Sequence, residues 1–237
     1  YSESHALVIG VSDYKEHPNA PFNWPDLPGV ITDIQLVRSA LEKHNFHVVL
    51  VENPNHEELE DAFKDFIRSY GHNTNNRLLF FFSGHGHTLK LATGLDMGYI
   101  VPSDAPPPAW DQRGFLSRAM DMQQMEVYAK RIQAKHALFL FDSCFSGSIF
   151  SLTRAAPSYI NYKTNHPVRQ FITAGRANEK VPDESIFRAQ FISALEGEAD
   201  TDEDGYLTGN ELGTFIEKKV INYSKESQHP QFGTLRN

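Results

Sequence analysis

Two continuous apolar runs constrain the fold of this chain more than any other feature. They are residues 78–82 (LLFFF) and 137–141 (ALFLF), and neither shows the alternation of polar and apolar residues that marks a half-buried strand. A strand without alternation has to be buried on both faces, as in the centre of a parallel sheet that helices cover on either side. The two runs therefore favour an α/β fold.

The rest of the chain alternates strand and helix patterns, as such a fold requires. The predicted strands are 46–51, 77–82, 137–141 and 168–173, with a short apolar run at 5–11, a hairpin that includes 98–102 and a candidate last strand at 231–235. The predicted helices are 30–41, 59–70 (started by Asn55), 122–132, 186–195 and one after an acidic loop near the end. This order predicts one domain over residues 1–237, an α/β sandwich with a mostly parallel central sheet.

Composition excludes several classes of function. Acidic residues outnumber basic ones by 30 to 22 without a basic stripe, so we expect no nucleic-acid partner. Apolar runs of about five residues fall far short of the ~20 that a membrane helix needs, so we expect no membrane partner. The chain begins at Tyr1 without a methionine, and we expect the natural chain to extend beyond both ends. The sequence does not identify the cellular compartment: we favour the cytoplasm, and secretion after cleavage of a signal peptide is the alternative.

The single cysteine, Cys144, follows one of the two buried runs. It excludes an internal disulfide and a CxxC zinc site. His85 follows the other run, in the stretch SGHGH at 83–87. If the two strands are parallel neighbours, their carboxyl ends share one edge of the sheet, and His85 and Cys144 face each other there.

A cysteine beside a histidine at a sheet edge is the arrangement of a nucleophile and its base. The thiolate is the reactive form of cysteine, and an imidazole can both generate it and protonate a leaving amine. The backbone N–H groups of Gly86 and Cys144 are candidates for an oxyanion hole. The competing interpretation is a small core cysteine and a turn histidine. We favour catalysis because both residues occupy matching strand-to-turn positions. We reject zinc at His85 and His87, since no further ligand has suitable spacing.

The stretches SGHG at 83–86 and DSCFSG at 142–147 together resemble the motifs of caspase-like cysteine peptidases, most closely the metacaspase and orthocaspase branch. The resemblance covers nearly the whole chain, including HALVIGVSDY at 5–14 and RQFITAGRANE at 169–179. It implies a caspase-like α/β/α sandwich with a central sheet of about six strands. It also implies a Cys–His dyad that acts without a cofactor, and a monomer rather than a dimer.

The resemblance also implies a pocket for the substrate residue before the scissile bond, formed by Asp33, Ser83 and Asp142. Two carboxylates in a narrow cleft favour a cation, so we expect cleavage after Arg, with Lys as an alternative. Aspartate in this pocket would bring like charges together, and asparagine would leave the acids unpaired.

Residues 200–211 (DTDEDGYLTGNE) have the spacing of an EF-hand calcium loop. The predicted ligands are Asp200, Asp202, Asp204, the carbonyl of Tyr206, and Glu211. The alternative is an acidic turn between two helices, with Glu211 in a cap. Metacaspases commonly bind calcium at another aspartate cluster, one member of which lies seven residues after the nucleophile. Ser151 occupies that position here, so the usual calcium route looks incomplete.

Relatives of this kind often cleave themselves in the loop after the nucleophile. Residues 148–168 lack periodicity and contain Arg154 and Lys163, which are the candidate cleavage sites. Arg169 is disfavoured because it begins a predicted strand. The alternative to a peptidase that cuts basic proteins or peptides is a non-catalytic or calcium-sensing module on the same scaffold.

Overall fold

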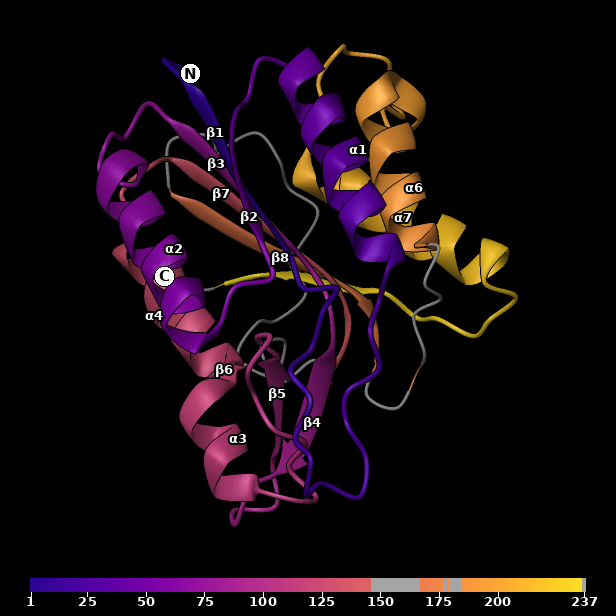
Figure 1. Ribbon diagram of the computed structural model, residues 1–237. Coiled ribbons are helices and arrows are strands. Elements are labelled where there is room, and N and C mark those ends of the chain that lie inside the picture. The colour runs from indigo at the N-terminus through magenta and orange to yellow at the C-terminus, as the bar shows by residue number, and fades with distance from the viewer. Residues whose placement is uncertain (146–166, 177–178, 180–184, 236–237) are drawn as a thin grey trace.

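The computed structural model describes residues 1–145, 167–176, 179 and 185–235, and for Cys144 it describes the backbone only. A six-stranded sheet divides the molecule into layers (Figure 1). In spatial order its strands are β2 (His47–Glu52), β1 (Ser4–Gly10), β3 (Arg77–Ser83), β7 (His136–Cys144), β8 (Val168–Gly175) and β9 (Gln231–Thr234). The first five run parallel and β9 is antiparallel. The predicted mostly parallel α/β/α sandwich of about six strands is confirmed.

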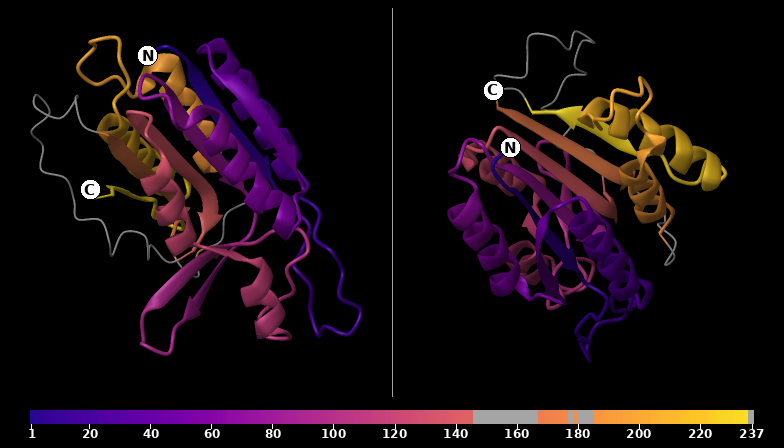
Figure 2. Two further views of the ribbon diagram at one scale, coloured as in Figure 1. Left: turned by 90° about the vertical axis from the view of Figure 1, so that its left-hand side faces the viewer. Right: turned by 90° about the horizontal axis from the view of Figure 1, so that it is seen from above.

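Helices cover both faces of the sheet. On one face lie α2 (His56–Tyr70) and α4 (Met122–Arg131); on the other lie α1 (Gly29–Lys43), α6 (Ile186–Ser193) and α7 (Gly209–Tyr223) (Figure 2). A π-helical turn, η1 (Ala194–Glu198), extends α6. Asn55 is the N-cap of α2, as expected, and forms a capping box with Glu58.

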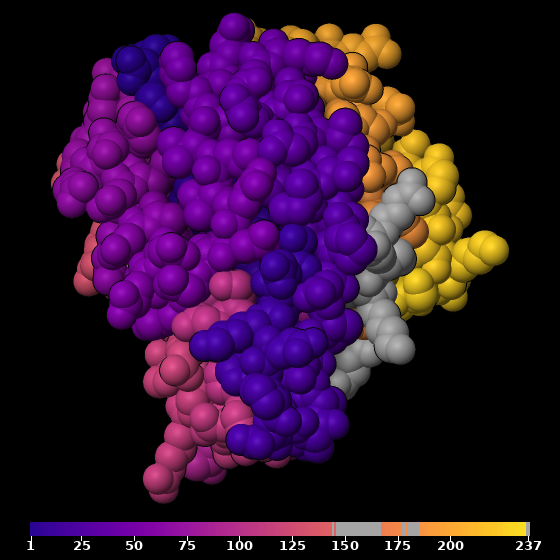
Figure 3. Space-filling model, in the orientation of Figure 1, coloured from indigo at the N-terminus to yellow at the C-terminus, as the bar shows by residue number. Residues whose placement is uncertain are grey.

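A smaller antiparallel sheet lies below the main one. It consists of β4 (Gly86–Lys90), β5 (Asp96–Ile100) and β6 (Met120–Asp121), beside the short helix α3 (Gln112–Arg118). Together with the loop over residues 11–28, this region forms the protruding lower end of the molecule in the space-filling view (Figure 3). We did not predict α3, because seven residues that contain a glycine and follow a proline-rich loop show no clear helical period.

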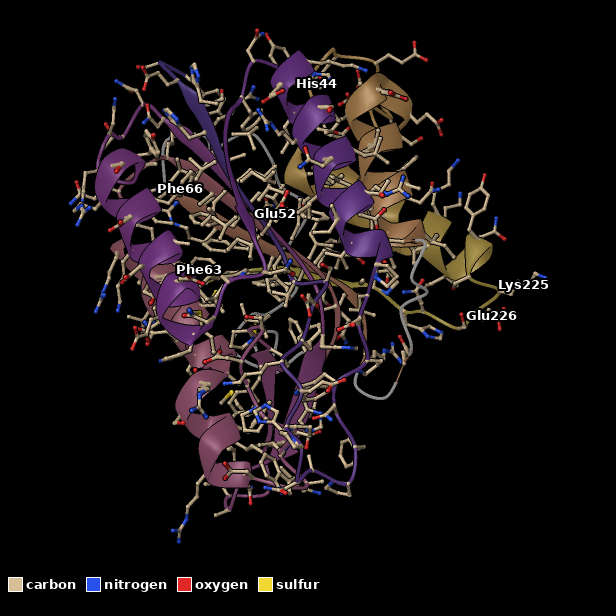
Figure 4. The ribbon with its side chains drawn as sticks, viewed as in Figure 1. His44, Glu52, Phe63, Phe66, Lys225 and Glu226 are labelled. Carbon is tan, nitrogen blue, oxygen red and sulfur yellow. The ribbon has the colours of Figure 1, made fainter. Side chains whose placement is uncertain are left out.

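The two faces of the sheet have separate apolar cores. Phe80, Phe139 and Phe171 stack across β3, β7 and β8, with ring centroids 4.4 and 4.7 Å apart. Phe63 and Phe66 point from α2 onto this stack (Figure 4). The opposite core contains Val8, Ile34, Phe81, Leu140, Phe191 and Ile216. Because both faces are covered, the apolar runs that we identified as doubly buried strands are buried as expected, apart from Leu138, which is partly buried.

Removal of the central ring of the stack tests how far the stability of the fold depends on this packing. Phe139→Ala is expected to lower the free energy of unfolding by ~3–5 kcal/mol, since Phe139 is fully buried between two aromatic rings. Denaturant unfolding followed by circular dichroism measures the change. Phe22→Ala is the matched control, because Phe22 is 49% exposed and should change stability little. Equal effects for both variants would contradict the assignment of Phe139 to the core.

Candidate active site

The ends of β3 and β7 lie side by side at one edge of the sheet. The two strands pair in parallel, and Ser83 is directly opposite Asp142. His85 lies two residues beyond Ser83, and Cys144 ends β7 and pairs with Gly175 of β8. The register between β7 and β8 shifts between Phe141 and Cys144, so the strand is irregular where it reaches Cys144. The predicted juxtaposition of the two strand ends is therefore present in the backbone.

The side chain of His85 is held in one orientation. Its Nε2 lies 2.8 Å from the carbonyl oxygen of Pro25, so Nε2 carries the hydrogen and donates it. That tautomer leaves Nδ1 as the basic nitrogen. The rings of Tyr14 and Trp24 pack at 4.7 and 5.3 Å from the imidazole. Burial lowers the pKa of His85, with smaller opposing effects from Pro25 and Asp26, and so favours the neutral base.

Tyr14 and Ser143 fix the turn that carries His85. The hydroxyl of Tyr14 accepts a hydrogen bond of 2.7 Å from the backbone N–H of His85. A Cβ atom at Gly84 would lie 2.9 Å from that hydroxyl, so the glycine allows the close approach. The hydroxyl of Ser143 donates to the carbonyl of Gly84 at 2.6 Å and links the two strand ends directly.

Sequence reasoning missed both Tyr14 and Ser143. Ser143 lies inside the stretch that we singled out, and its position next to Cys144 was a usable signal. Tyr14 lies 71 residues from His85, and no local pattern connects them. Gly86 directly follows His85, begins β4 and pairs with Ile100 of the smaller sheet. The oxyanion role of Gly86 and Cys144 stays a prediction, and the side chain of Cys144 lies outside the described residues.

The three predicted pocket residues come together. Asp33 from α1, Ser83 from β3 and Asp142 from β7 are 3%, 3% and 2% exposed. Within the described residues, neither carboxylate oxygen of Asp142 makes a hydrogen bond of normal geometry, although the hydroxyls of Ser83 and Ser185 face it. Burial raises the pKa of Asp142 to about 7, and the charge of Asp33 adds to the rise.

An arginine that sequence reasoning did not anticipate shares this pocket. Nε of Arg188, on α6, donates to Oδ1 of Asp33 at 2.7 Å, and the two side chains are 14% and 4% exposed. The cluster of predicted pocket residues therefore contains two acids and one arginine of the protein itself. Our expectation of two carboxylates that await a substrate cation is incomplete without this third charge.

The proposed calcium loop lies elsewhere. It connects η1 to α7 at the end of the molecule away from β4, β5 and β6 (Figures 1 and 2). Carboxylate oxygens of Asp200, Asp202 and Asp204 lie within 4.8 Å of one another. Gly205 has φ = +81° and donates its N–H to Asp200 at 2.9 Å.

Glu211 lies outside that aspartate cluster. It forms a capping box with Thr208 at the start of α7 and also accepts from Thr201. Tyr206 is exposed. Three of the five predicted ligands thus lie close enough together to bind one cation. Glu211 instead caps the start of α7, which is the role that the alternative interpretation gave it.

Two further expectations concern cleavage and membranes. Arg154 and Lys163 lie outside the described residues. Arg169 is buried in β8, where its guanidinium donates to the carbonyls of Ala129, Ile132, Lys135 and Val168. It is therefore inaccessible, as we expected.

In the described part of the chain, every helix is too short or too polar to span a bilayer.

Comparison with known proteins agrees with this geometry. No curated protein matches the sequence. Among solved structures, the crystal structure of protein GSU0716 from Geobacter sulfurreducens aligns with a TM-score of 0.66 and 14% identity, over 98% of this chain and 93% of that one. At this identity the likeness concerns the fold alone. The family model for the caspase domain, Peptidase_C14, matches residues 3–234, and this chain therefore belongs to the caspase-domain family of cysteine peptidases.

Proposed function

We propose that this chain is a cysteine endopeptidase that cleaves after basic residues through Cys144 and His85, and that it is a monomer of the metacaspase and orthocaspase branch. The observation that carries the proposal is the alignment of β3 with β7, which brings the backbone of Cys144 and the oriented imidazole of His85 to one sheet edge. The family membership supports the reaction class.

The chemistry follows from the orientation of His85. In the proposed reaction, Nδ1 takes the thiol proton of Cys144, and the thiolate attacks the scissile carbonyl. The N–H groups of Gly86 and Cys144 stabilise the oxyanion. The imidazolium then protonates the leaving amine, and water hydrolyses the thioester. Tyr14 and Ser143 position the reacting groups through the backbone.

The acids of the pocket support the basic preference. Asp142 is buried, and neither of its carboxylate oxygens makes a hydrogen bond of normal geometry within the described residues, which is costly unless a ligand satisfies it. A guanidinium or an ammonium group from the substrate would do so. Arg188 already places its own guanidinium against Asp33, which supports the proposal that these acids can bind the guanidinium of a substrate.

Peptide hydrolysis tests the reaction class, the preference and the role of calcium together. Fluorogenic peptides that end in Arg, Lys, Asp or Asn would be offered to the wild type, Cys144→Ala and His85→Ala. We expect cleavage after Arg or Lys and a loss of at least about a thousandfold in both variants. Each assay is run with Ca²⁺ and with a chelator.

We propose Ca²⁺ as a ligand of loop 200–211, with Asp200, Asp202 and Asp204 as its binding groups. A dependence of the rate on Ca²⁺ that Asp202→Asn abolishes would support it. Cleavage after Asp or Asn would contradict the basic preference. No cleavage in any condition would favour the non-catalytic module.

The titration of Asp142 predicts a pH dependence of binding. Because its pKa is raised to about 7, the carboxyl is protonated below pH 7 in the free protein and ionised above it. Binding of a cation requires the ionised form. KM for an Arg peptide, divided by KM for its neutral citrulline analogue, should fall roughly tenfold from pH 6 to pH 8.

The ratio cancels the titration of His85 and Cys144, which both substrates share. Asp142→Asn is the matched variant, since it keeps the shape of the side chain and removes the charge. We expect it to flatten the profile and to weaken the preference for Arg. A wild-type ratio that is constant across this range would contradict the role of Asp142.

We also propose self-cleavage after Arg154 or Lys163. The purified wild type should give two fragments on a denaturing gel, with the new ends identified by mass spectrometry. Cys144→Ala and the double variant Arg154→Gln, Lys163→Gln should remain single bands. A wild type that is fully active as one uncut chain would show that self-cleavage is not required.

A further inference from the structure

The ion pair between Arg188 and Asp33 lies inside the proposed pocket. It joins α6 to α1 across 155 residues of sequence, and only small fractions of both side chains are exposed. The other arginine and lysine pairs of the described chain are much more exposed. Lys219 with Glu198 is one of these, with side chains 35% and 58% exposed at a distance of 3.4 Å.

Burial makes this pair costly to form and costly to break. A buried ion pair repays its desolvation only when the geometry is good, and removal of one partner leaves an uncompensated charge. The exposed pairs contribute little by comparison. A contact whose purpose was only to hold α1 against α6 could be apolar, as Phe81 and Phe191 are in the same core.

One turn of α6 faces both acids of the pocket. Ser185 is the N-cap of α6 and accepts from the N–H of Arg188 at 2.9 Å, and its hydroxyl faces Asp142. The charged groups that face Asp142 within the described residues are Asp33 from α1 and Arg188 from α6. The hydroxyls are those of Ser83 from β3 and Ser185. Arg188 therefore acts on Asp142 as well as on Asp33.

The charges of the three residues limit what can enter. Asp33 and Arg188 cancel, so the free pocket carries between 0 and −1, according to the protonation of Asp142. One substrate cation brings the charge to zero when Asp142 is ionised. Without Arg188 the same pocket would carry −1 to −2, and an entering cation would meet Asp33 directly.

We infer that Arg188 is a specificity-determining residue: it is an internal counter-ion that occupies Asp33 and leaves Asp142 as the acid that receives the substrate cation. This inference rests on the proposed function, and it names the acid that receives the basic side chain and the residue that selects it. Entry of the cation then expels the proton of Asp142 to the buffer.

Proton release on ligand binding tests the inference without catalysis. The probe is n-butylguanidinium, and the protein is the full chain with Cys144→Ala. Calorimetry in two buffers of different ionisation enthalpy gives the number of protons released. With Arg188 present we expect about 0.9 proton at pH 6 and about 0.1 at pH 8, because Asp142 is ionised on binding.

Substitution of Arg188 should change this number. In Arg188→Gln the cation pairs with Asp33, so release at pH 6 should fall below about 0.3 proton and affinity at pH 6 should rise. Arg188→Lys keeps the charge and should keep the release. Arg38→Gln is the control, because Arg38 on α1 forms an exposed pair with Glu42.

The double variant Asp33→Asn, Arg188→Gln controls for misfolding of Arg188→Gln, because it removes both charges of the pair and leaves no uncompensated buried charge. It should fold, bind the probe and release the proton as the parent does. Unchanged release in Arg188→Gln, or loss of binding in the double variant, would overturn the inference.

The peptide assay separates this result from the proposed function. Cleavage after Arg with unchanged proton release would leave the function standing and reject the role of Arg188. Probe binding with the expected release but no peptide cleavage would reject the peptidase and support Arg188 as the residue that selects the receiving acid.

Discussion

The parallel pairing of β3 with β7 is the constraint on which the rest of the site depends. It sets Ser83 opposite Asp142 and so determines which residues beyond each strand end can meet. A shift of one residue would turn every side chain of β7 to the other face of the sheet. The stack of Phe80, Phe139 and Phe171 on one face, and the packing of Phe81 and Leu140 on the other, oppose such a shift because each ring has its own partners.

Hydrogen bonds of polar groups then fix the backbone and the imidazole of His85 at this edge. Ser143 links the end of β7 to the turn after β3, and Tyr14 holds the backbone of His85 from a third segment. Pro25 selects the tautomer of the imidazole through its carbonyl. These contacts come from strands and loops that the apolar core has already placed, so the core and the site are parts of one arrangement.

Charge is distributed unevenly around the edge. Burial favours the neutral imidazole of His85, and Asp33 is neutralised by Arg188. The carboxyl of Asp142, with its pKa raised to about 7, is partly protonated near neutral pH. Each of these states follows from desolvation, which disfavours an isolated charge and favours either an ion-pair partner or the neutral form of the group. The four side chains therefore carry little net charge together.

Much of the architecture could be predicted from the chain alone. The runs at 78–82 and 137–141 indicated doubly buried strands, Asn55 indicated a helix start, and the positions of His85 and Cys144 just beyond two strands indicated a shared edge. These inferences succeed because periodicity, capping and adjacency to a strand end are local properties of the chain. The helix α3 escaped prediction because its seven residues carry too little of that periodicity.

The sequence by itself determined most of the order of strands and helices, and it placed Cys144 and His85 at the ends of two strands that share one edge. Only the tertiary structure decided that Arg188 binds Asp33, that Asp142 is buried beside Asp33, and that Tyr14 supports His85. The reason is physical: ion pairs and pKa values depend on distances between segments far apart in the chain and on the loss of water around them.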